Sequence, residues 1–115
     1  MTKDSSVFLE HIIENIIDIE SFIKNVNKEE FLKNKEKQNA VIRSLEVIGE
    51  AVKNLPQNIT NKYSSIPWKE IAGTRDKITH HYFRVDLNII WDIIKQDLPD
   101  LKDKILKIKE ELSKR

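Results

Sequence analysis

The residue types that can do acid–base chemistry gather in one short stretch that contains Arg75, His80 and Tyr82. Arginine carries a permanent positive charge on a planar fork that matches phosphate oxygens. Histidine gains or loses a proton near neutral pH, so it can act as a general base or acid. Such a pair suffices in principle for metal-free cleavage of RNA, because the 2′-hydroxyl can attack the adjacent phosphorus while arginine stabilises the transition state. DNA lacks that hydroxyl and would be spared.

The spacing of Arg75 and His80 places a demand on the structure. Five residues of α-helix turn by about 140° and rise about 7.5 Å, so these two side chains do not share one helix face. They converge only if the arginine reaches across, if the helix is distorted near its end, or if a second subunit contributes. A two-fold dimer that brings two copies of the segment together meets the demand. The alternative is a packed or solvated histidine, since Arg-x4-His alone has little specificity.

The sequence offers no pattern for a metal or cofactor site. The chain has no cysteine, which excludes a disulfide scaffold, a thiolate metal site and a thiol nucleophile. His80 and His81 are adjacent, and neighbouring helical residues diverge by about 100°, so they form a poor chelating pair. His11 lies between apolar residues and is predicted to be structural. We therefore expect no metal and no cofactor.

Length and composition favour one helical domain, spanning residues 1–115. Only two glycines and three prolines occur, which argues against long flexible linkers and a turn-rich β-sandwich. The 20 basic and 19 acidic residues balance, which argues against a polybasic binder. No apolar run approaches the roughly 18 residues of a membrane span, and the opening has no signal-peptide pattern. We therefore expect a cytoplasmic protein with no membrane partner.

Hydrophobic periodicity predicts an all-α bundle with two long helices and several shorter ones. The first long helix, at about residues 5–26, is expected to be capped by Asp4 or Ser5 and to bury a wide, isoleucine-rich stripe. A homodimer is the economical way to cover so much apolar helix surface on a short chain. The remaining helices are expected at about residues 27–34, 35–55, 68–72, 75–82, 87–96 and from 99 onward, with at most one turn at 59–63.

Individual residues set the expected bounds of these helices. Asn27 and Glu30 resemble a capping box, with Phe31 and Leu32 as the anchor of the short helix that follows. Gly49 indicates close approach of a neighbouring helix. Three further expectations concern the second half of the chain: a break at Gly73 and Thr74, an N-cap at Asp86, and inward-facing Ile89, Ile90, Ile93 and Ile94.

An ordered set of motifs extends over nearly the whole chain. The set comprises AVIRSLEVIGEA at residues 40–51, IPWKEIAG at 66–73, Arg75-x4-His80-x-Tyr82-Phe83, Val85-Asp86 and Trp91-Asp92. Together these motifs resemble the HepT-like branch of the HEPN superfamily. Known members of that branch are small helical proteins that form homodimers and act as ribonuclease toxins in toxin–antitoxin modules. Their partner is MntA, a minimal nucleotidyltransferase that silences the toxin by adding AMP to the motif tyrosine.

The resemblance implies roles for particular residues. Arg75 and His80 would be the catalytic pair, and Tyr82 would be the site of AMP addition. Asp76, at a position where relatives often have Asn, would orient the pair or tune its charge. An anionic nucleotide two residues from His80 would block RNA phosphate by volume and by repulsion, which requires an exposed tyrosine hydroxyl.

Other residues that match family positions receive no catalytic role. Arg43, Glu46 and Glu50 form a charged seam at spacings of three and four, and we treat them as structural or supporting. His81 stands where relatives often have a different residue, so it is assigned nothing.

The leading hypothesis is therefore a metal-independent endoribonuclease toxin that acts on RNA, with tRNA and mRNA as candidates, and that is silenced by an MntA-like nucleotidyltransferase. The first alternative is a non-catalytic helical module that binds a nucleotidyltransferase. The second is a plain helical dimer without a catalytic role. Toxicity on induced expression distinguishes the ribonuclease toxin from both alternatives.

Overall fold

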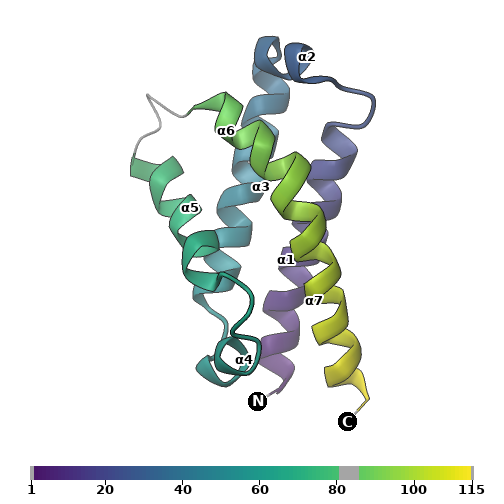
Figure 1. The fold of residues 1–115 in the computed structure, drawn as a ribbon, viewed down its shortest axis with the longest axis vertical. Helices are drawn as coiled ribbons and strands as arrows, with labels where there is room; N and C mark the ends of the chain where they lie inside the picture. The colour runs from purple at the N-terminus through teal and green to yellow at the C-terminus, as the bar shows by residue number, and fades with distance from the viewer. Residues whose placement is uncertain (1, 81–85, 115) are drawn as a thin grey trace.

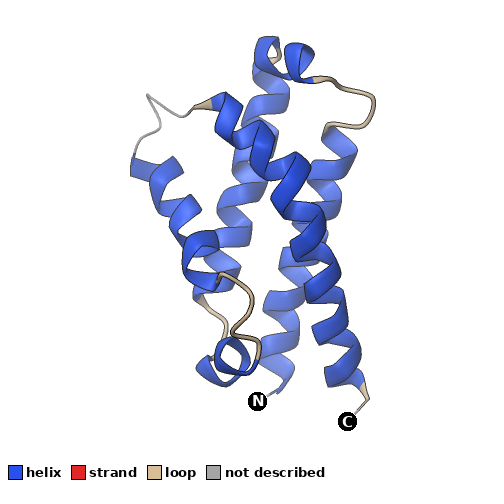
Figure 2. Ribbon diagram, viewed as in Figure 1, coloured by secondary structure: helices blue, strands red, loops and turns tan. Residues whose placement is uncertain are grey.

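The computed structural model describes the chain over residues 2–80 and 86–114, and its side chains over residues 6–74 and 86–114. Within these ranges every regular element is helical, which confirms the all-α prediction (Figure 2). None of the described helices is long and apolar enough to cross a membrane. The helices are α1 (Thr2–Phe22), α2 (Lys28–Lys33), α3 (Lys35–Lys53), α4 (Gln57–Lys62), α5 (Trp68–His80), α6 (Leu87–Asp92) and α7 (Leu98–Ser113), with a π-helical turn at Ile93–Asp97.

The longer helices α1, α3, α5 and α7 run along the long axis of the molecule and form a bundle (Figure 1). Helix α3 packs against both α1 and α5, and α7 packs against α1. The short helices α2 and α4 lie at opposite ends of the bundle (Figure 1). Among the described residues, α5 and α7 pack against each other much less than the three helix pairs just named. The bundle is therefore closed on three sides.

The predicted apolar stripe of the first helix lies in the core. Leu9, Ile12 and Ile16 are completely buried, and Ile19 is nearly so. Burial of each such side chain contributes about 1.5–3 kcal/mol relative to leaving it in water. Helices α3 and α7 supply the facing core residues Val41, Leu45, Ile48, Val52, Leu101, Ile105 and Ile108.

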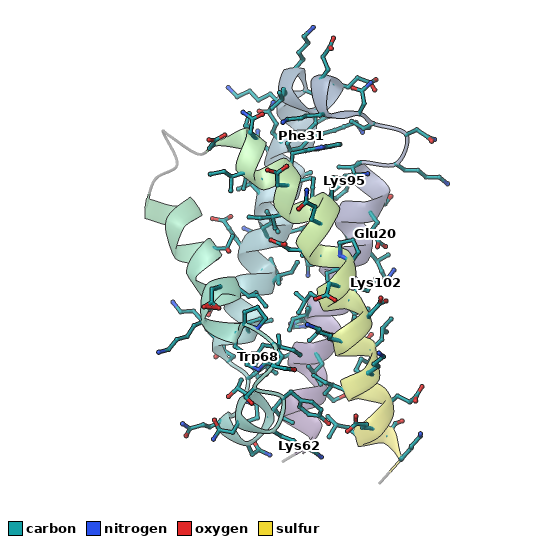
Figure 3. All side chains as sticks on the ribbon, in the orientation of Figure 1. Glu20, Phe31, Lys62, Trp68, Lys95 and Lys102 are labelled. Carbon is teal, nitrogen blue, oxygen red and sulfur yellow. The ribbon has the colours of Figure 1, made fainter. Side chains whose placement is uncertain are left out.

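Ion pairs flank the apolar contact between α1 and α7. Lys102 Nζ lies 2.9 Å from Glu20 Oε1 (Figure 3). Lys109 pairs with Glu10 in the same way. Because all four side chains remain partly in water, each pair contributes no more than about 1 kcal/mol. The core, and not these pairs, therefore holds α7 in place.

Both predicted ends of the first helix are wrong. The helix begins at Thr2, so Asp4 and Ser5 lie inside it and not at its N-cap. The helix ends at Phe22, several residues before the expected end. Asn25 follows with a φ of 61°, a left-handed conformation that asparagine tolerates better than most residues. This turn directs the chain into α2.

The capping box at the start of α2 is confirmed. Asn27 Oδ1 accepts a hydrogen bond from the Glu30 amide at 2.8 Å, and Glu30 Oε1 accepts one from the Asn27 amide at 3.1 Å. Phe31 is completely buried and lies 5.3 Å from the ring of Trp91, centroid to centroid. Leu32 is exposed, so the prediction that it helps to anchor α2 is wrong. One aromatic side chain holds this short helix.

The predicted break at Gly73 and Thr74 is also wrong, because α5 continues from Trp68 to His80. Thr74 Oγ1 donates a hydrogen bond to the Glu70 carbonyl at 3.0 Å, which keeps its hydroxyl satisfied inside the helix. Apart from the glycine, its two chain neighbours and the backbone of its own helix, no heavy atom lies within 4 Å of the point where a Cβ would stand at Gly73. A glycine in open space weakens a helix without ending it.

After the undescribed residues 81–85, Asp86 caps α6 as predicted, and its Oδ1 accepts from the Asn88 amide at 2.9 Å. The expected single helix at residues 87–96 is instead α6 followed by the π-helical turn. Ile90 and Ile94 are buried, and Ile93 is half-buried. Ile89 is 57% exposed, so its predicted inward orientation is wrong.

The two glycines should respond to alanine in opposite directions. Gly73→Ala should raise the free energy of unfolding by about 0.5–1 kcal/mol, because the new methyl group meets no neighbour and the helix gains a better former. Gly49→Ala, at a buried position on α3, should lower it by about 1–3 kcal/mol through overpacking. Urea unfolding followed by circular dichroism measures both. A destabilised Gly73→Ala protein would contradict the continuous, uncovered α5.

Candidate functional site

Helix α5 is the element that carries the predicted chemistry. Arg75 and Asp76 lie in its second half, and His80 is its last residue. The side chains of residues 75–80 are outside the described part of the chain, as are residues 81–85 with Tyr82. The catalytic pair, the supporting aspartate and the modification site therefore stay predictions, and their backbone frame on α5 can be described.

The start of α5 is fixed by Trp68, which is buried in the core near the α4 end of the molecule (Figure 3). Its indole Nε1 donates a hydrogen bond to the Tyr63 carbonyl at 3.1 Å, so the ring is held both by packing and by its polar edge. Pro67 precedes the helix, and its carbonyl accepts from the Ile71 amide at 3.1 Å. These contacts set where the helix begins and in which direction it runs.

Helix α5 packs against α3. Ile71 and Ala72 are half-buried and pack against the core, into which α3 contributes Leu45 and Ile48. Gly49 is buried on the same helix, in agreement with its predicted place at a helix contact. The chain runs down α3 and returns along α5, so the second half of α5 lies toward the α6 end of the molecule (Figure 1). The helix that carries the predicted pair is thus anchored by apolar packing against the core.

Helix α5 continues through Gly73 and as far as His80. Gly73 precedes both members of the predicted pair, so its place inside the helix does not change how Arg75 and His80 lie relative to each other. The two positions differ by about 140° in direction and about 7.5 Å in height on a regular helix. The reach of the long arginine side chain, a distortion near the end of the helix and the contribution of a second subunit all stay predicted routes.

The charged seam on α3 is mostly in solvent. Arg43 and Glu50 are exposed, and Glu46 is half-buried. The Asn54 side chain donates to the Glu50 carbonyl at 2.8 Å and to its carboxylate at 3.2 Å, which ties Glu50 to the end of α3. The structural or supporting role expected for this seam stays a prediction.

His11 is exposed on α1 and does not belong to the core, so its predicted structural role there finds no support. Its backbone carbonyl accepts a hydrogen bond from the Asn15 side chain at 2.8 Å. Within the described residues, no group of three or more His, Asp or Glu side chains is arranged to hold a metal ion.

A cavity of about 400 Å³ lies beside α5, and sequence reasoning missed it. Each helix that lines it shows an ordinary amphipathic pattern, so no single segment signals the cavity. The signal is the packing of helices around it, which hydrophobic periodicity does not specify. Its lining comes from α3, from the start of α5, and from the π-helical turn and α7: Leu45, Ile48, Ile66, Pro67, Glu70, Ile71, Thr74, Ile93, Gln96, Asp97, Leu98, Asp100, Leu101 and Lys104.

Comparison with known proteins bears directly on the motif that α5 carries. The sequence profile of the family described as "Ribonuclease HepT-like" matches residues 12–108, a range that includes all of α5. No solved structure shows significant similarity to this chain.

Several curated relatives are similar over most of this chain. A probable ribonuclease HepT of Thermococcus cleftensis is 44% identical over 110 residues, which cover 96% of this chain and all of the relative. A candidate RNase of Methanocaldococcus jannaschii is 54% identical over 102 residues, which cover 88% of this chain and 84% of the relative.

A second protein of Methanocaldococcus jannaschii, whose name joins gamma-glutamylcyclotransferase to a candidate RNase, is 49% identical over 99% of this chain. The chain spans about half of that relative's length, 51%. The family profile and the identities of 44–54% over most of the chain lead to one conclusion. The chain belongs to the HepT-like ribonuclease family of the HEPN superfamily.

Proposed function

We propose that this chain is a metal-independent endoribonuclease in which Arg75 and His80 act on one phosphodiester of RNA. The observation that carries the proposal is the match to a ribonuclease family over residues 12–108, which includes Arg75-x4-His80 on α5. In the proposed reaction His80 takes the proton of the 2′-hydroxyl, and that oxygen attacks the adjacent phosphorus. The bond to the 5′-oxygen breaks, and a protonated general acid donates to the leaving oxygen. The products are a 2′,3′-cyclic phosphate and a 5′-hydroxyl.

Arg75 is proposed to stabilise the negative charge that builds up on the phosphorus oxygens during this step. A guanidinium is suited to the task, since it stays charged and can donate two parallel hydrogen bonds to one phosphate. Asp76, next to it on the helix, is proposed to orient the pair. The chemistry requires only protein side chains and the 2′-hydroxyl of the substrate, so tRNA and mRNA are both suitable substrates.

We further propose that the active site is completed in a homodimer. Positions five residues apart on a regular α-helix differ by about 140° in direction, and a two-fold axis near α5 would bring the second copy of each residue into the same active site. The arginine of one subunit would then act with the histidine of the other.

For regulation we propose a toxin–antitoxin pair in the cytoplasm, in which an MntA-like nucleotidyltransferase adds AMP to Tyr82. Tyr82 follows His80 by two residues in the motif. An attached nucleotide there would occupy the volume that RNA needs and would repel its phosphates.

Removal of either member of the pair should abolish cleavage. With a chelator present, Arg75→Ala and His80→Ala should each lower the rate on single-stranded RNA by about 10²–10⁴-fold, because a charge stabiliser or a proton carrier is lost. His11→Ala, at an exposed histidine on α1, is the matched control and should keep the full rate. Equal cleavage by the wild type and by both single variants would point to a contaminating nuclease. A wild type that binds a nucleotidyltransferase but cleaves nothing would favour the non-catalytic module.

Mixing the two inactive variants tests whether the site is shared between subunits. If Arg75 of one subunit acts with His80 of the other, refolding Arg75→Ala with His80→Ala in equal amounts should restore about one quarter of the wild-type rate, since half of the dimers are mixed and each holds one intact site. If both residues of a site come from one chain, no activity returns. A monomer mass in light scattering at micromolar concentration would reject the shared site altogether.

The position of AMP addition can be read from the two tyrosines of the chain. Co-expression with the cognate nucleotidyltransferase should add AMP to the wild type and to Tyr63→Phe, and should leave Tyr82→Phe unmodified. Tyr63 is a suitable control, since its hydroxyl donates to Glu111 at 2.8 Å, away from the motif. Intact-protein mass spectrometry measures the adduct, and an adduct that persists in Tyr82→Phe would refute the assignment.

A further inference from the structure

The bundle has one open side, between α5 and α7. In a closed four-helix bundle each helix contacts two neighbours. Here α1 contacts α3 and α7, and α3 contacts α1 and α5, but the described parts of α5 and α7 do not pack together to a similar extent. Figure 1 shows α3 between α5 and the run from α6 into α7. The open side is a groove between two helices, with α3 as its floor.

The inside of this groove is apolar. Leu45 and Ile48 of α3 form the floor, Ile71 of α5 forms one wall, and Leu98 and Leu101 of α7 form the other. The enclosed volume of about 400 Å³ lies within the range of about 300–1,000 Å³ that is typical of ligand sites. Apolar side chains that line an unfilled space of this size gain free energy when another apolar group displaces the water.

The mouth of the groove is acidic. Among the residues whose side chains are described, Glu70, Asp97 and Asp100 line it together with one basic residue, Lys104, which pairs with Asp100 at 3.0 Å. Glu70 and Asp97 form no ion pair with any residue that the structure describes. The whole chain is balanced at 20 basic and 19 acidic residues, so this acidity is local. It attracts cationic groups and repels RNA phosphate.

The π-helical turn shapes one wall of the groove. The Leu98 amide bonds to the Ile93 carbonyl, five residues back, which widens the helix by one residue at this point. Ile93, Gln96 and Asp97 of this turn all line the cavity. Such turns replace regular α-helix at a cost in hydrogen-bond geometry, and they occur frequently at functional sites.

We propose that the groove between α5 and α7 binds an amphipathic, basic helix of a partner protein. An open seam between two helices is the shape that a third helix fills, with apolar side chains three and four residues apart in the cavity. Lysine or arginine residues beside them would face Glu70 and Asp97. The described carboxylates at this mouth would repel the phosphates of a nucleic acid, which favours a basic protein helix as the occupant.

Occupation of the groove would act on the helix that carries the motif. Ile71 and Thr74 line the cavity, and Thr74 immediately precedes Arg75. A bound helix would fix α5 against α7 and so restrict the position of the predicted pair. This consequence rests on the proposed ribonuclease function, whereas the docking itself does not.

A pair of synthetic peptides tests the docking on the full chain. Both carry leucines at positions i, i+3, i+4 and i+7 and a fluorescent label, and they differ only in having lysines or glutamates at the other positions. Fluorescence anisotropy should show saturable binding of the lysine peptide and at least about tenfold weaker binding of the glutamate peptide. Absence of binding by the lysine peptide would overturn the proposal.

Charge reversal at the mouth separates a specific site from general attraction. The double variant Glu70→Lys, Asp97→Lys should bind the lysine peptide with an affinity lower by about tenfold or more. Glu14→Lys with Asp103→Lys makes the same change in net charge at exposed positions outside the groove and should leave the affinity within about twofold. Equal losses in both proteins would overturn the site. The site would also be overturned if the wild type self-associates and the Glu70/Asp97 variant alone loses this self-association. In that case a second copy of the chain would cover the groove.

The docking groove and the ribonuclease function can be contradicted independently of each other. If the peptide binds while the wild type never cleaves RNA, the docking groove stands and the ribonuclease assignment falls. If RNA is cleaved in an Arg75-dependent way while the lysine peptide never binds, the groove falls and the ribonuclease stands.

Discussion

The geometry of one continuous α-helix is the constraint on which the rest of this molecule depends. A regular helix presents residues five apart in different directions, and α5 runs without interruption through the positions of Arg75 and His80. Gly73 precedes both residues, so a bend there would move the two positions together and would not change their separation. In the proposed mechanism, the reach of the arginine side chain or a second subunit would bring the two functional groups to one phosphodiester.

The bundle gives α5 two unequal sides. Toward α3 it is held by core packing, with Trp68 as a hydrogen-bonded anchor at its start. Toward α7 it faces a cavity. Packed interiors deform little, whereas a helix with an open flank can shift at a smaller cost in contacts. The fold thus fixes where the motif helix begins and places a cavity beside its first half, at Glu70, Ile71 and Thr74.

The parts of this fold that follow from local chemistry could be predicted from the sequence. The isoleucine stripe of α1, the capping box at Asn27 and the cap at Asp86 depend on residues within one helical turn of each other, and all are observed. The break predicted at Gly73 failed because glycine lowers helix stability by only about 1 kcal/mol, which tertiary packing of α5 outweighs. Ile89 was misplaced because neighbouring residues on a helix differ by about 100° in direction, so the burial of Ile90 leaves Ile89 on another side of α6, where it is exposed.

The difference between local signals and distant packing also explains which parts of the site could be predicted from the sequence. Arg75, His80 and Tyr82 could be selected because their residue types and order form a motif, and a motif requires no knowledge of distant contacts. The groove could not be selected, since Ile48, Ile71 and Leu101 come from three helices and each looks like an ordinary core position. It depends on how little the described parts of α5 and α7 pack together, and the extent of packing between two distant helices leaves no local signature in the sequence. The negative charge at the mouth of the groove is also not predicted by hydrophobic periodicity. In the docking proposal, this charge favours a basic protein helix over RNA.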